Sequence, residues 1–249
     1  MRALVAEEPV VVWERPERGA RGPAPERSRG QITRAAVRLA DAGGLASVSV
    51  RQVAKELGTG PASLYRYVAG RDDLVDLMVD AATGEIDLTV ALTGEPVTDL
   101  VALATRTREV QLRHPWLLEV TPEAMRVGPC GLDYLEFALG ALAPVRMTGP
   151  AKLEAVAVLN ALVAMVSRAA LQSVRSPTAR QSAQAAYLAG AAGKGDHPLL
   201  AQALTSHPEA RPAVSPAAGP AAGPAQDAQD LFERVIRRAL AGLLAPDPK

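Results

Sequence analysis

The stretch SVRQVAKELGTGPASLYRYVAGRDDL, residues 49–74, decides the fold of this chain. It contains two short segments with helical apolar patterning, 50–57 and 61–68, separated by a turn that contains Gly58. Apolar residues at i, i+3, i+4 and i+7 give the first segment one buried face. Ala54 is small enough to lie where two helices cross, and Gly58 tolerates a left-handed backbone. The pattern predicts a helix-turn-helix, whose second helix enters the major groove of DNA.

Residues at the helix ends support this interpretation. Ser49 followed by Gln52 has the spacing of a capping box, and Pro61 suits the first turn of a helix. The acidic pair Asp72–Asp73 suits the N-terminal end of a fourth helix, which we expect over 71–88. A preceding helix is expected from Ser28 up to the Gly43-Gly44 pair.

The remaining chain is predicted to be helical as well. Residues 1–27 are rich in proline and charge and are expected to form a flexible arm. Breaks at proline and glycine divide the downstream region into expected helices at 97–113, 116–126, 130–142, 150–174, 177–191 and 227–244. The Ala/Pro/Gly-rich segment 205–226 is expected to be a mobile loop. The predicted fold class is therefore all-α, with a three-helix DNA-binding domain at 28–72 and a larger helical domain at 73–249.

The charge distribution favours DNA binding by the first domain. The chain has a formal net charge of zero, which excludes a uniformly basic nucleic-acid coat. Residues 15–71 nevertheless contain eleven basic and four acidic side chains, and residues 72–87 contain six acidic and no basic ones. Positive charge is thus concentrated on the arm and the helix-turn-helix, where phosphate contacts require it.

Other classes of protein find little support. The single cysteine, Cys130, excludes an intrachain disulfide and makes a thiolate zinc site improbable. The longest apolar run, 155–167, is shorter than the roughly 20 residues of a membrane span, and the N-terminus lacks the pattern of a secretion signal. No Gly-rich phosphate loop, HExxH, GxSxG or Cys/His cluster is present. We therefore expect a cytoplasmic protein that is not an enzyme, with no metal, cofactor or membrane partner.

Residues 49–74 resemble the DNA-binding domain of TetR-family transcriptional repressors. The most specific part is LYRYV followed by GRDDL, and the resemblance extends over about 28–85. The C-terminal region is similar only in kind to the tetracycline-repressor branch, being all-helical with a proline-rich loop before the last helix. The resemblance implies a ligand-responsive repressor that binds a palindromic operator as a homodimer and is released by a small-molecule effector.

The resemblance also implies a set of DNA-contacting residues. Arg51 would contact a base edge or a phosphate, Tyr67 and Arg71 would contact phosphates, and the others would lie in or beside the groove. Tyr65 and Tyr67 are also compatible with packing in the three-helix core. The full set is Arg51, Thr59, Ala62, Ser63, Tyr65, Arg66, Tyr67 and Arg71. Two features depart from many family members: the long arm, and the small residues Gly60-Pro61-Ala62 at the start of the recognition helix.

In the C-terminal domain, the resemblance implies a dimer interface made of helices 150–174 and 227–244 from each subunit. The alternative is that both helices belong to the core of a single subunit. Effector contacts are expected from polar or aromatic side chains in otherwise apolar helices. These are His114, Trp116, Met125, Tyr134, Phe137, Asn160 and Arg168. Each of them is also compatible with an ordinary role in the core or at a helix end. Effector binding would move helix 71–88 like a lever and separate the recognition helices.

Several alternatives share parts of this pattern. A transcriptional activator, or a helix-turn-helix regulator without a ligand, would contain the same DNA-binding half. More remote alternatives are a helical interaction protein that does not bind DNA, and an enzyme.

Overall fold

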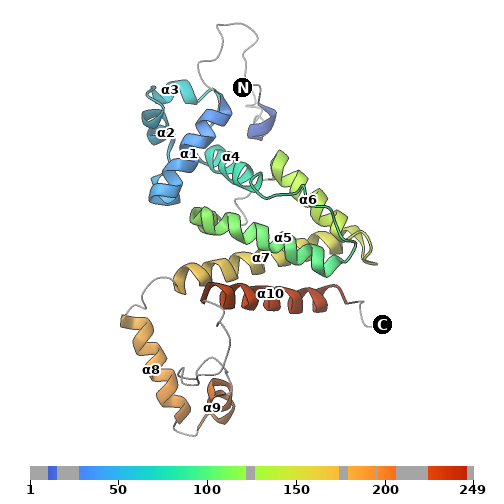
Figure 1. The fold of residues 1–249 in the computed structure, drawn as a ribbon. Helices are drawn as coiled ribbons and strands as arrows, with labels where there is room; N and C mark the ends of the chain where they lie inside the picture. Colours follow the sequence, from blue (N-terminus) through green and yellow to red (C-terminus); the bar gives the residue numbers. More distant parts are fainter. Residues whose placement is uncertain are drawn as a thin grey trace, which may run out of the picture. The chain divides into compact units, whose positions relative to one another are not determined.

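The computed structural model describes residues 11–15, 28–121, 127–173, 179–193, 196–205 and 224–245. Within these residues, all regular structure is helical (Figure 1). The chain forms two compact units, one made of Met1–Arg168 with Phe232–Lys249 and the other of Ala169–Leu231. The all-α prediction is confirmed.

Three helices near the N-terminus form the predicted helix-turn-helix arrangement, although the third ends at Leu64 and not at the predicted residue 68. They are α1 (Arg29–Gly43), α2 (Val50–Glu56) and α3 (Pro61–Leu64), and the short 3-10 helix η2 (Leu45–Ser47) connects the first two. Ile32, Val53 and Leu64 are fully buried at their common core. Ala54 is also fully buried, as expected for a small residue at a helix crossing.

Hydrogen bonds at the helix ends explain the boundaries. Gly58 adopts a φ of 65°, which lies in the left-handed region. Its N–H bonds the carbonyl of Lys55, and the next N–H, of Thr59, bonds the carbonyl of Ala54. These two bonds form a Schellman motif that ends α2 sharply. The reciprocal capping box occurs at α1, between Ser28 and Gln31, whereas at α2 only the Ser49 half is formed.

Helix α4 (Arg71–Thr83) connects the DNA-binding helices to the rest of the first unit. It packs against α1, against α5 (Pro96–Arg113) and against α6 (Pro129–Ala141) (Figure 1). Every residue from Asp73 to Asp80 is buried, which is consistent with contacts on several sides. The helix ends five residues before the predicted boundary at 88, because the turn at Gly84 breaks it.

Two longer helices complete the first unit. They are α7 (Gly149–Ser173) and α10 (Pro224–Leu243), and both continue into the second unit. Phe232, Ile236 and Leu240 of α10 are buried in the core. Within α7, Gly149–Gln172 is long and apolar enough to meet a length-and-hydropathy criterion for a membrane span, with a mean hydropathy of 1.6. Core helices of soluble proteins meet the same criterion, so this property is weak evidence for a membrane.

The prediction of a helix over 116–126 is wrong for residues 116–121, which the structure describes. The chain forms the 3-10 helix η3 (Pro115–Glu119) there and becomes extended at Val120. Residues 122–126 lie outside the described part of the chain.

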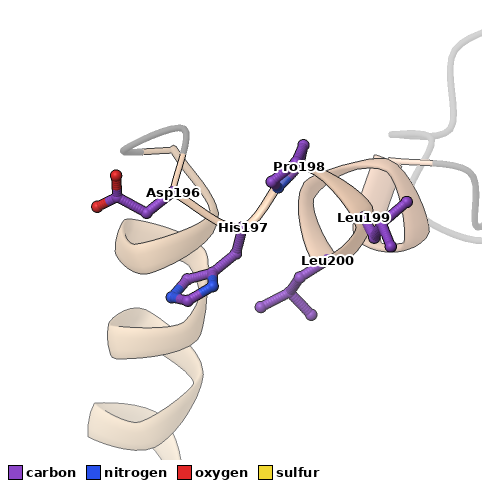
Figure 2. A pocket seen from close by; sticks show the side chains of 5 residues that line it. All are labelled: Asp196, His197, Pro198, Leu199 and Leu200. Carbon is purple, nitrogen blue, oxygen red and sulfur yellow. The ribbon is translucent and has the colours of Figure 1, made fainter.

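The second unit contains α8 (Ala179–Gly193) and α9 (Pro198–Thr205), which pack against each other. The sequence pattern did not predict α9. An open hollow of about 400 Å³ lies beside the connection between them, lined by Asp196–Leu200. His197 and Leu200 face each other across it, and Asp196 points away (Figure 2). Most of the predicted mobile loop, residues 206–223, lies outside the described residues.

Part of the predicted flexible arm is folded. Residues 12–14 form the 3-10 helix η1 (Val12–Glu14), and Val12 is fully buried in the core of the first unit. The prediction therefore fails for residues 11–15, because the arm contributes apolar surface that α4 covers. The other arm residues before Ser28 lie outside the described part.

Candidate DNA interface and its connection to the C-terminal helices

The helix-turn-helix presents some of the predicted DNA-contacting residues at its surface. Arg51 in the first turn of α2 is exposed, as are Ala62 on α3 and Arg66 just after it. Tyr65 is an exposed large aromatic residue, with 55% of its surface accessible. Arginine and tyrosine side chains at this position can reach phosphates and base edges when α3 enters a groove.

Two further predicted contacts bond each other. The hydroxyls of Thr59 and Ser63 lie 2.9 Å apart, and the Ser63 hydroxyl donates to the carbonyl of Gly60 at 2.7 Å. Both side chains are partly exposed. These bonds stiffen the turn into α3, and a DNA contact from either hydroxyl would have to exchange or share them.

The structure contradicts the prediction for Tyr67. Its side chain is only 1% exposed and belongs to the core of the first unit. The reason is its position three residues after Leu64, on the inward side of the turn that follows α3. The guanidinium of Arg66 lies 4.8 Å from the centre of the Tyr67 ring, so the arginine covers the tyrosine at the surface.

Arg71 has a structural role that the sequence did not reveal. Its Nη2 donates to the carbonyl of Leu45 at 2.9 Å and its Nε to the carbonyl of Val48 at 3.2 Å. These bonds attach the η2 segment to the start of α4. Phosphate binding by Arg71 would therefore use a side chain whose orientation the fold already fixes.

Three acidic residues of α4 lie in the interior of the protein and not at its surface. Asp73, Asp76 and Asp80 are each at most 9% exposed. Asp73 pairs with Arg15 at 2.6 Å, so one positive charge of the arm is neutralised within the fold. Arg38 likewise pairs with Glu56 at the surface.

His114 and Trp116, two predicted effector contacts, lie instead at the junction of three helices. His114 Nδ1 is 2.7 Å from Oδ1 of Asp41 in α1, and its Nε2 is 3.1 Å from Oε2 of Glu85 beyond α4. The Trp116 indole donates to the same Asp41 oxygen at 2.8 Å. Both residues are at most 5% exposed. Their polar atoms are used to join the DNA-binding helices to the end of α5, which sequence spacing could not indicate.

Tyr134 and Asn160, two other predicted effector contacts, do meet. The Tyr134 hydroxyl donates to Oδ1 of Asn160 at 2.5 Å, which joins α6 to α7. The Thr107 hydroxyl of α5 lies within hydrogen-bonding reach of the same phenol, and burial raises the pKa of Tyr134. Phe137, one turn further along α6, packs under the Arg106 guanidinium with 5.4 Å between them. This polar cluster lies inside the helical bundle.

The remaining predicted effector residues are placed differently. Arg168 is exposed and donates to the carbonyl of Leu118 at 2.6 Å, which ties α7 to η3. Met125 lies outside the described residues. Two buried polar atoms that the sequence did not single out, Oγ of Ser167 and Oε1 of Gln111, have no hydrogen-bond partner among the described residues.

Neither of two open hollows in the described part is lined by the predicted effector residues. Besides the hollow at α9, one of about 380 Å³ lies at residues 84–89 together with Cys130 and Asp133. Burial and the Asp80 carboxylate raise the pKa of the Cys130 thiol, which favours the unreactive protonated form.

The fold and the exposed helix-turn-helix define a DNA-binding transcriptional regulator with a helical C-terminal domain. A family profile described as "Bacterial regulatory proteins, tetR family" matches residues 32–78, and one described as "Tetracyclin repressor-like, C-terminal domain" matches residues 93–246. The chain belongs to the TetR family of bacterial regulatory proteins.

Known relatives agree with this assignment. The HTH-type transcriptional repressor DrrR1 of Streptomyces coeruleorubidus is 37% identical over 65% of this chain, and the match spans 60% of DrrR1. An HTH-type transcriptional regulator of Saccharopolyspora erythraea is 34% identical over 78% of this chain and 81% of its own length. The crystal structure of the TetR family protein ActR of Streptomyces coelicolor in complex with actinorhodin is 23% identical. It has a TM-score of 0.65 and covers 89% of this chain and 97% of ActR.

Proposed function

We propose that this protein is a cytoplasmic repressor that binds a palindromic operator as a homodimer and releases it when a small molecule binds. The observation that carries the DNA-binding half is the exposure of Arg51, Tyr65 and Arg66 on a helix-turn-helix whose turn is fixed at Gly58. Thr59, Ala62 and Ser63 complete the groove-facing surface.

An unpartnered apolar face on α7 supports the homodimer. Leu153, Val158 and Met165 are between 46% and 57% exposed in the isolated chain, although they lie on one of its most apolar helices. On α10, Leu231 is 45% exposed, whereas the adjacent Phe232 is buried. A second copy of the chain would cover these faces, as the family resemblance implies for helices 150–174 and 227–244. Two recognition helices would then meet half-sites about 34–36 Å apart.

Buried polar groups support an effector site between α5, α6 and α7. Thr107, Tyr134 and Asn160 form a polar cluster contributed by these three helices, and Ser167 follows Asn160 two turns along α7. Because buried polar atoms are normally bonded, the unpartnered oxygens of Ser167 and Gln111 favour a ligand that bonds them. Phe137 and Met125 remain proposed as apolar contacts of that ligand.

The proposed switch is a movement of α4. This helix contacts α1 on one side and α5 and α6 on the other, so displacement of the effector helices would be transmitted to the DNA-binding domain. A coupling of about 1–3 kcal/mol, or roughly 5–150-fold in affinity, suffices for regulation.

The test of DNA binding is a selection of bound sequences from a random duplex pool by the full-length protein. We expect a palindromic product, and we expect the double variant Arg51→Ala/Tyr65→Ala to lose affinity for it. Arg146→Ala is a suitable control, because Arg146 is an exposed arginine outside the helix-turn-helix. Absence of any selected sequence would contradict the proposal.

Effector release is tested by a gel-shift titration of the selected operator with actinorhodin, chosen because ActR was solved with it. We expect the operator affinity to fall, and to fall less in Tyr134→Phe, which breaks the bond to Asn160. An unchanged operator affinity at saturating concentrations would exclude this compound as the effector.

A further inference from the structure

The segment Val11–Arg15 belongs to neither the proposed DNA-binding surface nor the proposed effector site, yet it is packed into the first unit. Val12 is fully buried, and η1 lies against α4 (Figure 1). Flexible arms do not bury a valine completely, so this segment contributes to the folded state.

At one end, the segment is attached to the start of α4. Nη1 of Arg15 donates to Oδ2 of Asp73 at 2.6 Å, and Asp73 is only 6% exposed. The same carboxylate oxygen accepts the backbone N–H of Ala69 at 2.6 Å. Arg29 of α1 donates to the carbonyl of Arg15. Arg15 therefore supports the turn that directly follows the recognition helix.

At the other end, the segment meets the start of α6. A Cβ atom placed on Gly128 would lie 2.5 Å from the Trp13 ring and 2.5 Å from the Asp80 carboxylate, so only glycine allows this approach. Oδ1 of Asp80 accepts the N–H of Gly131 in the first turn of α6 at 3.0 Å. Asp73 and Asp80 are two turns apart on α4, a distance of about 10 Å along its axis.

We propose that residues 12–15 form a strap that fixes α4 to the start of α6 and to the turn after α3, with Trp13 and Arg15 as positioning residues for DNA binding. The strap contacts both α4 and the start of α6, so it opposes movement of α4 relative to α6. In a dimer, it would thereby hold the two recognition helices at one separation. This inference rests on the proposed function, since it concerns how the recognition helix is oriented.

The experiment compares full-length Trp13→Ala, Arg15→Ala and Arg15→Lys with Glu14→Ala. Glu14 is the exposed residue of the same segment and serves as the matched control. The DNA probes are the operator selected by the wild-type protein, the same operator lengthened or shortened by one base pair between its half-sites, and an isolated half-site.

If the strap positions the recognition helices, Trp13→Ala and Arg15→Ala reduce the discrimination between correct and altered spacing by about fivefold or more, while half-site affinity stays within about twofold of wild type. Arg15→Lys restores part of the discrimination, and Glu14→Ala behaves as wild type. Unchanged discrimination would overturn the inference. A loss of half-site affinity as large as the loss of operator affinity would also overturn it, because the segment would then only support the fold of the helix-turn-helix.

A second measurement separates failure of this inference from failure of the proposed function. Amide hydrogen exchange needs no DNA. It should accelerate at Ala69 and Gly131 in Trp13→Ala and Arg15→Ala, because the strap supports the bonds of these amides to Asp73 and Asp80. If no DNA is selected but these amides exchange faster, the strap stands as a clamp on α4 and the DNA-binding proposal fails. Unchanged exchange at both amides would eliminate the strap.

Discussion

Nδ1 of His114 lies 2.7 Å from Oδ1 of Asp41, and this contact joins the end of α5 to the end of α1. The same Asp41 oxygen accepts the Trp116 indole N–H at 2.8 Å. A single carboxylate of the DNA-binding domain therefore satisfies two buried donors of the C-terminal region. A conformation that breaks this arrangement leaves those two donors without the acceptor, which costs free energy.

Removing that carboxylate should destabilise the protein. Asp41→Ala leaves the His114 and Trp116 donors without their acceptor, and we expect the free energy of unfolding to fall by about 1–3 kcal/mol. Urea unfolding followed by circular dichroism measures the change. Glu56→Ala is the matched control, because it removes an exposed partner of Arg38 and should change the free energy by less than about 1 kcal/mol. Equal effects of the two variants would show that the junction does not stabilise the fold.

Asp99 gives a prediction for the pH dependence of stability. Burial opposes ionisation of this carboxyl, but bonds from the backbone and hydroxyl of Thr93 and from the backbone of Gly94 outweigh it and lower the pKa of Asp99 below its ordinary 3.8. Because the folded-state pKa is the lower one, the carboxylate stabilises the fold at pH values above the unfolded-state pKa. This contribution disappears as the pH falls through the folded-state pKa.

We therefore expect Asp99→Asn to be less stable than wild type at pH 6–7, by about 1–3 kcal/mol, since the loop donors lose a charged acceptor. The difference should shrink as the pH falls below about 4, because the wild-type carboxyl is then protonated first in the unfolded state and, at lower pH, in the folded state. Urea titrations across pH 3–7 test this, with Thr98→Ala as an exposed neighbour for control. A difference independent of pH would exclude the carboxylate charge as its cause.

Local features of the fold were predictable because they depend on neighbours in sequence. Gly58 and Ser28 mark helix ends through bonds that span at most six residues, and Pro61, which lacks an N–H, stands in the first turn of α3. These boundaries are confirmed. For Tyr67, the alternative of packing in the core is the one the structure shows, because a resemblance transfers a residue type without its depth in the structure. The side chains that meet at His114 come from positions 41, 85 and 114, and no spacing rule connects them.

The candidate effector region shows the same limit. Composition singled out Tyr134 and Asn160, and these two residues bond each other. His114 and Trp116 had equally polar or aromatic character, but they lie at the domain junction, where Asp41 satisfies both. Single polar residues in apolar helices thus indicate buried polar sites without distinguishing a ligand site from a structural one.

Arg71 and Arg51 should separate folding from DNA binding. Arg71→Ala removes the donors to the Leu45 and Val48 carbonyls, and we expect a loss of about 1.5–3 kcal/mol in the free energy of unfolding. Arg51 is exposed, so Arg51→Ala should change stability by less than about 0.5 kcal/mol while weakening operator binding. If Arg51 contacts a phosphate, the salt dependence of binding should become shallower by about one unit in log–log slope. Wild-type stability in Arg71→Ala would show that its two backbone contacts are dispensable.

The exposed face of α7 leads to a prediction about assembly. Val158 is 50% exposed near the middle of that face, and a glutamate there would place an unpaired charge in an interface that is otherwise apolar. We expect Val158→Glu to shift the protein to monomers in sedimentation velocity experiments, and to weaken binding to the palindrome while half-site binding persists. Leu132→Glu on α6 is the matched control, since Leu132 is 60% exposed but lies on a helix outside the proposed interface. A dimer that survives in Val158→Glu, or a monomer produced equally by Leu132→Glu, would place the subunit contact elsewhere on the molecule. If the subunits meet through α7, the dimer and the high affinity for the palindrome must be lost at the same protein concentration, because one subunit carries only one helix-turn-helix.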